Sequence, residues 1–244
     1  MTRLGWLAWG RFGGCENARV PETRGQGPLP SLLVLLTIMT GLVDSVSFLE
    51  LGNVFVANMT GNIVFLGLGL GGSGTEVLLT TVSTGFFCLG AVLGGHFAFT
   101  RLDHRGRLLG AATATQAGAL VVAAVIVANL GHRPDPGRLA TIAVLAVSMG
   151  WQYAIVRRLE VPDFRTVVVT TTLTALVAER GESGARFARR GLSIAALLLG
   201  AAIGALLVRN VSVSAPLWCA AVLLAVVAAA SFVAARRPDA RNWA

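Results

Sequence analysis

One carboxylate lies deep inside an apolar run of the sequence. Asp44 comes six residues before Glu50, within the apolar segment Leu32–Leu49. A charge at the centre of a bilayer costs about 2.5–3.5 kcal/mol on insertion scales, so such a group is normally turned inward, paired or protonated. Two interpretations stay open. Asp44 is either a carboxylate that handles protons or cations in a cavity, or a structural residue that hydrogen-bonds a threonine or the backbone of a neighbouring helix.

Asp44 also belongs to a polar stripe, because residues three and four apart share one face of a helix. The stripe consists of Thr37, Thr40, Gly41, Asp44 and Ser47. The small and hydroxyl-bearing side chains of this face suit either a cavity wall or close contact with another helix.

A second polar group, the motif N-M-T-G-N, lies at the centre of the apolar stretch Asn53–Leu70. Gly61 permits a backbone break or a sharp bend, and Asn58 and Asn62 share a face if this stretch is helical. Helix ends and side-chain amides can hold an ion or a polar solute, which makes Asn58, Thr60 and Asn62 candidate binding residues. The alternative is an interhelical clasp, worth about 0.6 kcal/mol per hydrogen bond.

Threonines form a matching polar group in the apolar stretch Thr166–Ala178. The candidates for solute or ion binding there are Thr170, Thr172 and Thr174, with Thr171 between them and Gln152 upstream. Threonine hydroxyls readily bond the carbonyl four residues earlier in a helix, which favours a structural role for this group.

Six segments have the length and apolarity to position these groups across a bilayer, since a spanning helix needs roughly 17–25 residues. They are Leu32–Leu49, Val77–Phe99, Leu108–Leu130, Leu139–Val156, Leu192–Val208 and Leu217–Ala235. The stretches Asn53–Leu70 and Thr166–Ala178 have polar centres and are predicted to be broken or re-entrant. The fold class is therefore an all-α integral membrane protein with six transmembrane helices.

The arginines predict the orientation of these helices. All 20 basic residues are arginine, and six spans place seventeen of them in the tails and loops on one side and three on the other. Cytoplasmic loops carry the excess of basic residues, so both termini are predicted to be cytoplasmic, in a plasma membrane. Residues 1–30 form a predicted disordered tail, residues 31–236 the membrane domain, and residues 237–244 a second tail.

Composition and motifs exclude several other classes. Hydrophobic residues make up 55% of the chain and charged residues 13%, whereas an ordinary soluble domain is about a quarter charged. The arginines flank apolar runs, which indicates membrane topology and no nucleic-acid partner. Cysteine pairs, intramembrane histidine clusters, H-E-x-x-H and P-loop motifs are missing. We therefore expect no enzyme activity, no metal and no cofactor, with membrane lipid as a partner.

The chain repeats itself at an offset near 110 residues, in halves of about 31–130 and 139–235. The run L-G-A-V-L-G from Leu89 matches L-G-A-A-I-G from Leu199, and Gly41 falls one position from register with Gly150. Each half contributes three crossings, an odd number, so the halves must be inverted. Inverted repeats with paired broken segments place a transporter's binding site where these segments meet.

Six glycines, five within the spans and one in the stretch Asn53–Leu70, are predicted to be structural. The residues concerned are Gly41, Gly61, Gly90, Gly94, Gly200 and Gly204. Small residues four apart let two helices approach closely, within one chain or in a homo-oligomer. The lone amide of Gln116, in the third span, is predicted to be an interhelical hydrogen bonder.

The motif G-L-V-D-S-V-S-F-L from Gly41, followed by N-M-T-G-N, resembles the YoaK-like family of bacterial membrane proteins. A second motif of that family, usually M-T-G-T-L-T, corresponds to residues 169–174. Here Val169 replaces the usual Met and Thr171 the usual Gly, which weighs against a flexible break there. The resemblance spans roughly Leu32–Ala235 and implies a plasma-membrane protein of about six spans, without a known activity.

Together these features predict a small secondary transporter or channel-like permease for an unidentified solute or ion. Asp44 would be the titrating or cation-attracting group, and the asparagine and threonine clusters would shape the solute site. The alternative is a non-transporting membrane scaffold or lipid-interacting protein whose polar clusters only hold helices together.

Overall fold

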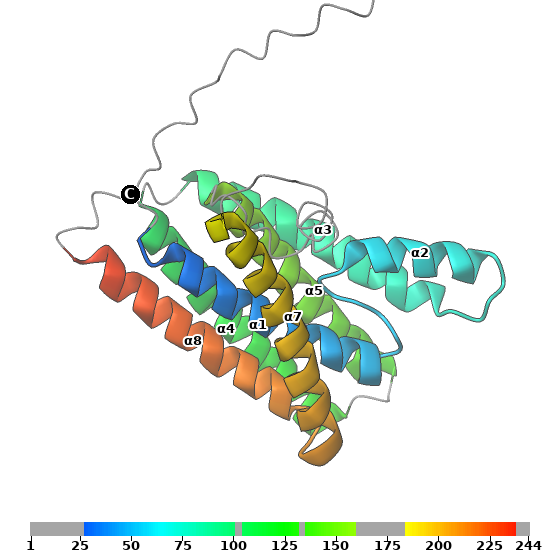
Figure 1. Ribbon diagram of the computed structural model, residues 1–244. Helices are drawn as coiled ribbons and strands as arrows, with labels where there is room; N and C mark the ends of the chain where they lie inside the picture. The colour runs from blue at the N-terminus through cyan, green and yellow to red at the C-terminus, as the bar shows by residue number, and fades with distance from the viewer. Residues whose placement is uncertain (1–26, 101–103, 132–134, 160–183, 238–244) are drawn as a thin grey trace, which may run out of the picture.

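The computed structural model describes residues 27–100, 104–131, 135–159 and 184–237, and within these ranges every element is an α-helix (Figure 1). The helices run in chain order as α1 (Leu29–Glu50), α2 (Met59–Leu70), α3 (Val77–Thr100), α4 (Arg105–Leu130), α5 (Asp135–Arg158), α7 (Gly184–Asn210) and α8 (Ala215–Ala235). The all-α fold class is thereby confirmed.

Six of these helices are long and apolar enough to cross a membrane, and they contain the six predicted spans. The helix α8 begins after Ser214 with Pro216 in its first turn, where a missing N–H leaves no hydrogen bond unmade. The helix α2 has 12 residues and is therefore about 18 Å long. That length falls short of the roughly 30 Å hydrocarbon core, so α2 is not a seventh span.

The long helices pack in pairs that join distant parts of the chain. The helix α3 lies against α5, α1 against α7, and α4 against α8. Two further contacts, between α4 and α5 and between α1 and α8, join these pairs into one bundle (Figure 1). The most buried helix is α1, whose leucines and valines lie in the centre of the hydrophobic core.

Glycines bring the backbones of two helix pairs into direct contact. Gly41 of α1 lies against the carbonyl of Leu197, and Gly200 of α7 lies against that of Ile38. We call the close contacts at these two glycines, and at Gly90 and Gly150 between α3 and α5, the glycine crossings. In the second pair Gly90 faces Val147 and Gly150 faces Phe87. A methyl group added at any of the four glycines would overlap backbone atoms of the facing helix.

The chain turns back at the end of α1. Gly52 and Asn53 have positive φ angles of 98° and 54°, and glycine reaches this region without steric cost. Residues 51–58, which we call the returning loop, then run back beside α1 before α2 begins. The helix α2 packs on the first half of α3 and projects from the side of the bundle (Figure 1).

The predicted stretch Asn53–Leu70 is thus divided, because its first part is loop and its second part is α2. The sharp bend lies at Gly52 and Asn53, whereas Gly61 is within the helix. There a larger residue would overlap the ring of Phe55. The predicted stretch Thr166–Ala178, with its threonines, lies outside the described residues.

Candidate functional site

Asp44 holds the backbone of the returning loop. Its Oδ1 accepts hydrogen bonds from the backbone N–H groups of Val56 at 3.2 Å and Ala57 at 3.0 Å. Both loop residues are buried, and a buried N–H group without a partner would be costly. Hydrogen bonds to an ionised acceptor are the stronger kind. The carboxylate thus fixes a non-helical segment about 9 Å from the end of α1, given the 1.5 Å rise per residue.

Asn62 holds the same loop through the neighbouring residue. Its Oδ1 accepts from the N–H of Phe55 at 3.0 Å, and its Nδ2 donates to the Phe55 carbonyl at 2.6 Å. Ser83 of α3 donates to that carbonyl at 2.6 Å and accepts from Asn62 Nδ2 at 3.2 Å. The Asn62 amide therefore bonds both the N–H and the carbonyl of Phe55, as a neighbouring β-strand would.

Three aromatic rings cover one side of this arrangement. The ring of Phe55 stacks on Phe48 of α1 with centroids 5.0 Å apart and on Phe65 of α2 at 6.0 Å. Such stacked pairs add about 0.5–1.5 kcal/mol each beyond the area they bury. The absence of a side chain at Gly61 leaves room for the Phe55 ring. The returning loop is therefore fixed by polar groups and by aromatic packing.

The structure brings some of the predicted site residues together and separates others. Asp44 and Asn62 converge on residues 55–57, although they come from different helices. Asn58 lies just before α2 and Thr60 in its first turn, and both are exposed. Because α2 begins at Met59, Asn58 and Asn62 do not form the common helical face expected from their spacing.

The polar stripe of α1 contacts three different neighbours. Thr37 and Thr40 each donate to the carbonyl four residues earlier. Gly41 contacts α7, Thr40 accepts from Gln152 of α5 at 3.1 Å, and Asp44 binds the returning loop. The stripe is therefore buried in protein along most of its length, and only Asp44 within it is partly exposed.

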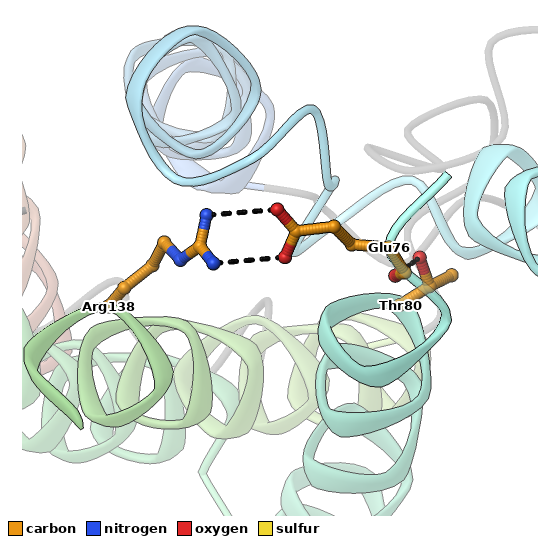
Figure 2. Close-up of polar contacts among 3 residues, drawn as sticks. All are labelled: Glu76, Thr80 and Arg138. Atoms are coloured by element: carbon orange, nitrogen blue, oxygen red, sulfur yellow. Dashed lines mark hydrogen bonds and ion pairs between the residues drawn. The ribbon is translucent and has the colours of Figure 1, made fainter. Parts of the chain in front are cut away.

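An ion pair joins α5 to the segment that precedes α3. Arg138 contacts both carboxylate oxygens of Glu76, at 3.2 and 2.9 Å (Figure 2). Thr80 donates to the Glu76 backbone carbonyl, and Gly52, at the start of the returning loop, lies beside the guanidinium. The partners are 62 residues apart, and neither has a motif around it, so no sequence signal could have paired them.

The described residues offer hydrogen-bonding groups and one membrane carboxylate, and no cluster of metal-ligating side chains occurs among them. The six long apolar helices of the described residues define a multi-pass integral membrane protein.

The family is identified by the sequence match. The family described as "Protein of unknown function (DUF1275)" matches residues 32–230, which is most of the chain, so the protein belongs to this family. The UPF0700 transmembrane protein YoaK of Bacillus subtilis (strain 168) is 31% identical over 151 residues, 61% of this chain. The aligned region covers 66% of that relative, just under two thirds of its length. The predicted YoaK-like resemblance is confirmed. No solved structure matches the chain significantly.

Proposed function

We propose that this protein is a small secondary transporter or channel-like permease in which Asp44 is the titrating or cation-attracting group. The supporting observation is the position of its carboxylate. Oδ1 holds the returning loop, while Oδ2 accepts no hydrogen bond from the described part of the chain and the side chain is partly exposed. An ionisable residue within a membrane span is costly to place there, which makes it a functional-site hypothesis by default.

The charge of Asp44 also determines how strongly the returning loop is held. A carboxylate is a stronger hydrogen-bond acceptor than a protonated acid. Proton or cation binding at Asp44 therefore weakens its hold on the N–H groups of Val56 and Ala57. The loop leads directly to Asn58 and Thr60, whose exposed side chains receive the solute at the start of α2, while Asn62 keeps the loop attached to α3. Thr170, Thr172 and Thr174 complete the site from the second half.

The inverted repeat is part of this proposal, and the helix contacts support it. In the repeat, α1 corresponds to α5, α3 to α7, and α4 to α8. The contact between α3 and α5 then corresponds to the contact between α7 and α1, and the contact between α4 and α5 corresponds to the one between α8 and α1. The glycine crossings also correspond, because the contact of Gly90 with Val147 in the pair α3–α5 matches the contact of Gly200 with Ile38 in the pair α7–α1. The corresponding residues lie 110 and 109 positions apart, which is the offset of the sequence repeat.

Both termini are proposed to be cytoplasmic in a bacterial plasma membrane. Six crossings return the chain to the side on which it started, and the arginines are concentrated on that side. The pair of Glu76 and Arg138 then lies at the outer end of the helices. No enzyme activity, ATP or redox cofactor is part of the proposed mechanism, and a homo-oligomer is compatible with it.

The proposal is tested with purified protein in liposomes. Proton and cation fluxes and the uptake of small polar solutes are measured against protein-free vesicles across a pH series. We expect the native protein to carry at least one of these. Asp44→Asn keeps an oxygen for the loop and removes the charge, so it should abolish the pH dependence of that flux. Unchanged flux and unchanged pH dependence in this variant would refute the role of Asp44.

One observation favours the scaffold alternative. Both atoms of the Asn62 amide are engaged within the protein, as in a clasp that only joins helices. Cysteine substitutions at positions 58, 60 and 62, in a chain lacking its natural cysteines, distinguish the two functions. Modification of positions 58 and 60 by a water-soluble thiol reagent supports a solvated site at bilayer depth, and inert positions support the scaffold.

A further inference from the structure

A chain of side-chain amides crosses the centre of the bundle, away from the returning loop. Gln116 of α4 donates through Nε2 to Gln152 Oε1 of α5 at 2.8 Å. Gln152 then donates through Nε2 to Thr40 Oγ1 of α1 at 3.1 Å. The residues Gln116, Gln152 and Thr40 are 2%, 3% and 2% exposed, respectively. These bonds link three helices at a place where each polar group must find a partner within the protein.

Two polar atoms beside this chain lack such a partner. The hydroxyl of Ser148, in α5, is buried and makes no hydrogen bond with the described residues. In all hydrogen bonds of the Gln116 amide, Nε2 is the donor, and one of them goes to the Ser148 carbonyl at 3.4 Å. Its Oε1 therefore has no donor within the described ranges. One hydroxyl on α5 and one carbonyl oxygen on α4 are thus left without a partner in the described residues, and together they could bond a molecule that both donates and accepts.

The surroundings restrict the charge of such a molecule. Every buried polar side chain in the described part of the chain carries a hydroxyl or an amide group. None of Thr40, Gln116, Ser148 and Gln152 supplies a charge, so an ion held among these four side chains would lose its hydration without an opposite charge within the cluster, which is far costlier than the transfer of a neutral group. Glutamine amides and serine hydroxyls do not titrate near neutral pH, so they cannot supply the charge themselves.

We propose that Thr40, Gln116, Ser148 and Gln152 form a binding site for a small uncharged molecule with hydroxyl or amide groups. This inference rests on the proposed transport function and names its solute class. Thr40 lies one helical turn from Asp44 on the same face of α1, so the neutral site and the carboxylate are neighbours along this helix. Asp44 responds to protons or cations there, and the amide chain holds the solute.

A direct test measures access to position 148. Ser148→Cys is made in a chain whose natural cysteines are replaced by alanine, and it is treated with a neutral methyl and a cationic trimethylammonium-ethyl thiosulfonate reagent. We expect the neutral reagent to react at least tenfold faster, and acetamide to slow it. Ser231→Cys is the matched control, because Ser231 is also buried but bonds the Val227 carbonyl. Equal reaction with both reagents, or no protection by acetamide, would overturn the site.

Transport by the same chain separates this inference from the proposed function. Proteoliposomes are given water gradients, glycerol, acetamide or potassium and sodium salts. We expect uptake of glycerol or acetamide at least fivefold above empty vesicles. Gln116→Leu should remove this uptake, and Ser231→Ala should not. Ion flux without neutral-solute uptake, or water flux alone, refutes the neutral organic solute and leaves a transport function standing. Acetamide protection of the Ser148→Cys variant without any flux supports the site and refutes transport.

Discussion

The glycine crossings and the returning loop are held by different forces. At the crossings, helix backbones touch directly, because Gly41, Gly90, Gly150 and Gly200 have no side chain to separate them. The returning loop is held by Asp44, Asn62 and Ser83 through a few hydrogen bonds and by the Phe55 ring. Close packing therefore fixes the bundle, whereas the returning loop is fixed by hydrogen bonds that a change of charge at Asp44 can weaken.

The largest effect is expected at the crossings. Gly200→Leu forces a side chain into the backbone of α1 at Ile38, and overpacking typically costs about 1–3 kcal/mol, and more where backbone must move. We expect a fall of many degrees in the thermal unfolding midpoint in detergent, or failure to fold. Gly118→Leu, where no atom lies within 4 Å of the added carbon, is the control and should unfold near the native temperature. Equal stability of the two variants would contradict the packing at the crossings.

A smaller loss is expected from Asn62→Leu, because Phe55 loses the partner of its N–H. An unsatisfied buried group costs about 1–3 kcal/mol. The Phe55 carbonyl retains Ser83 as a donor, so the effect should fall below that of Gly200→Leu. The midpoint of thermal unfolding measures it. Asn129→Leu is the control, since exposed Asn129 bonds only the carbonyl of its own helix.

Substitution of Asp44 should increase local opening of the returning loop more than opening of the helix bundle. Asp44→Ala removes the acceptor for Val56 and Ala57, whereas Asp44→Asn keeps an oxygen in its place. Hydrogen exchange at residues 56 and 57 should therefore be fastest in the alanine variant, intermediate in the asparagine variant and slowest in the native protein. Exchange in the middle of α5 provides the internal reference. Exchange at residues 56 and 57 that matches the native rate in both variants would show that Asp44 does not hold the loop.

The smallest effect is expected at Glu76 and Arg138. The Glu76 side chain is 48% exposed, and ion pairs near the surface contribute about 0–1 kcal/mol. Glu76→Gln should lower the unfolding midpoint slightly, and the difference from the native protein should shrink in high salt because exposed charges are screened. The exchange of charges in Glu76→Arg with Arg138→Glu should recover part of the loss. A loss as large as that of Asn62→Leu would show that this pair supports the bundle.

Much of the site could not be predicted from the sequence. The spacing of Asn58 and Asn62 suggested a shared helical face, but α2 begins between them and only Asn62 is buried. Ser83 had no distinguishing neighbours, and the amide of Gln152 meets Thr40 across 112 positions of the chain. The interhelical bonding predicted for Gln116 is confirmed. Hydrogen bonds between distant segments depend on how helices are placed, which local patterns do not encode.

The sequence by itself determined the six spans, because about twenty consecutive apolar residues have one stable form in a bilayer. It also marked Asp44, since a carboxylate in such a segment is costly wherever its helix is placed. Only the tertiary structure decided what Asp44 binds, how the returning loop reaches it, and which glycines touch which helices. These contacts join residues far apart in the chain, and their geometry exists only after the helices have packed.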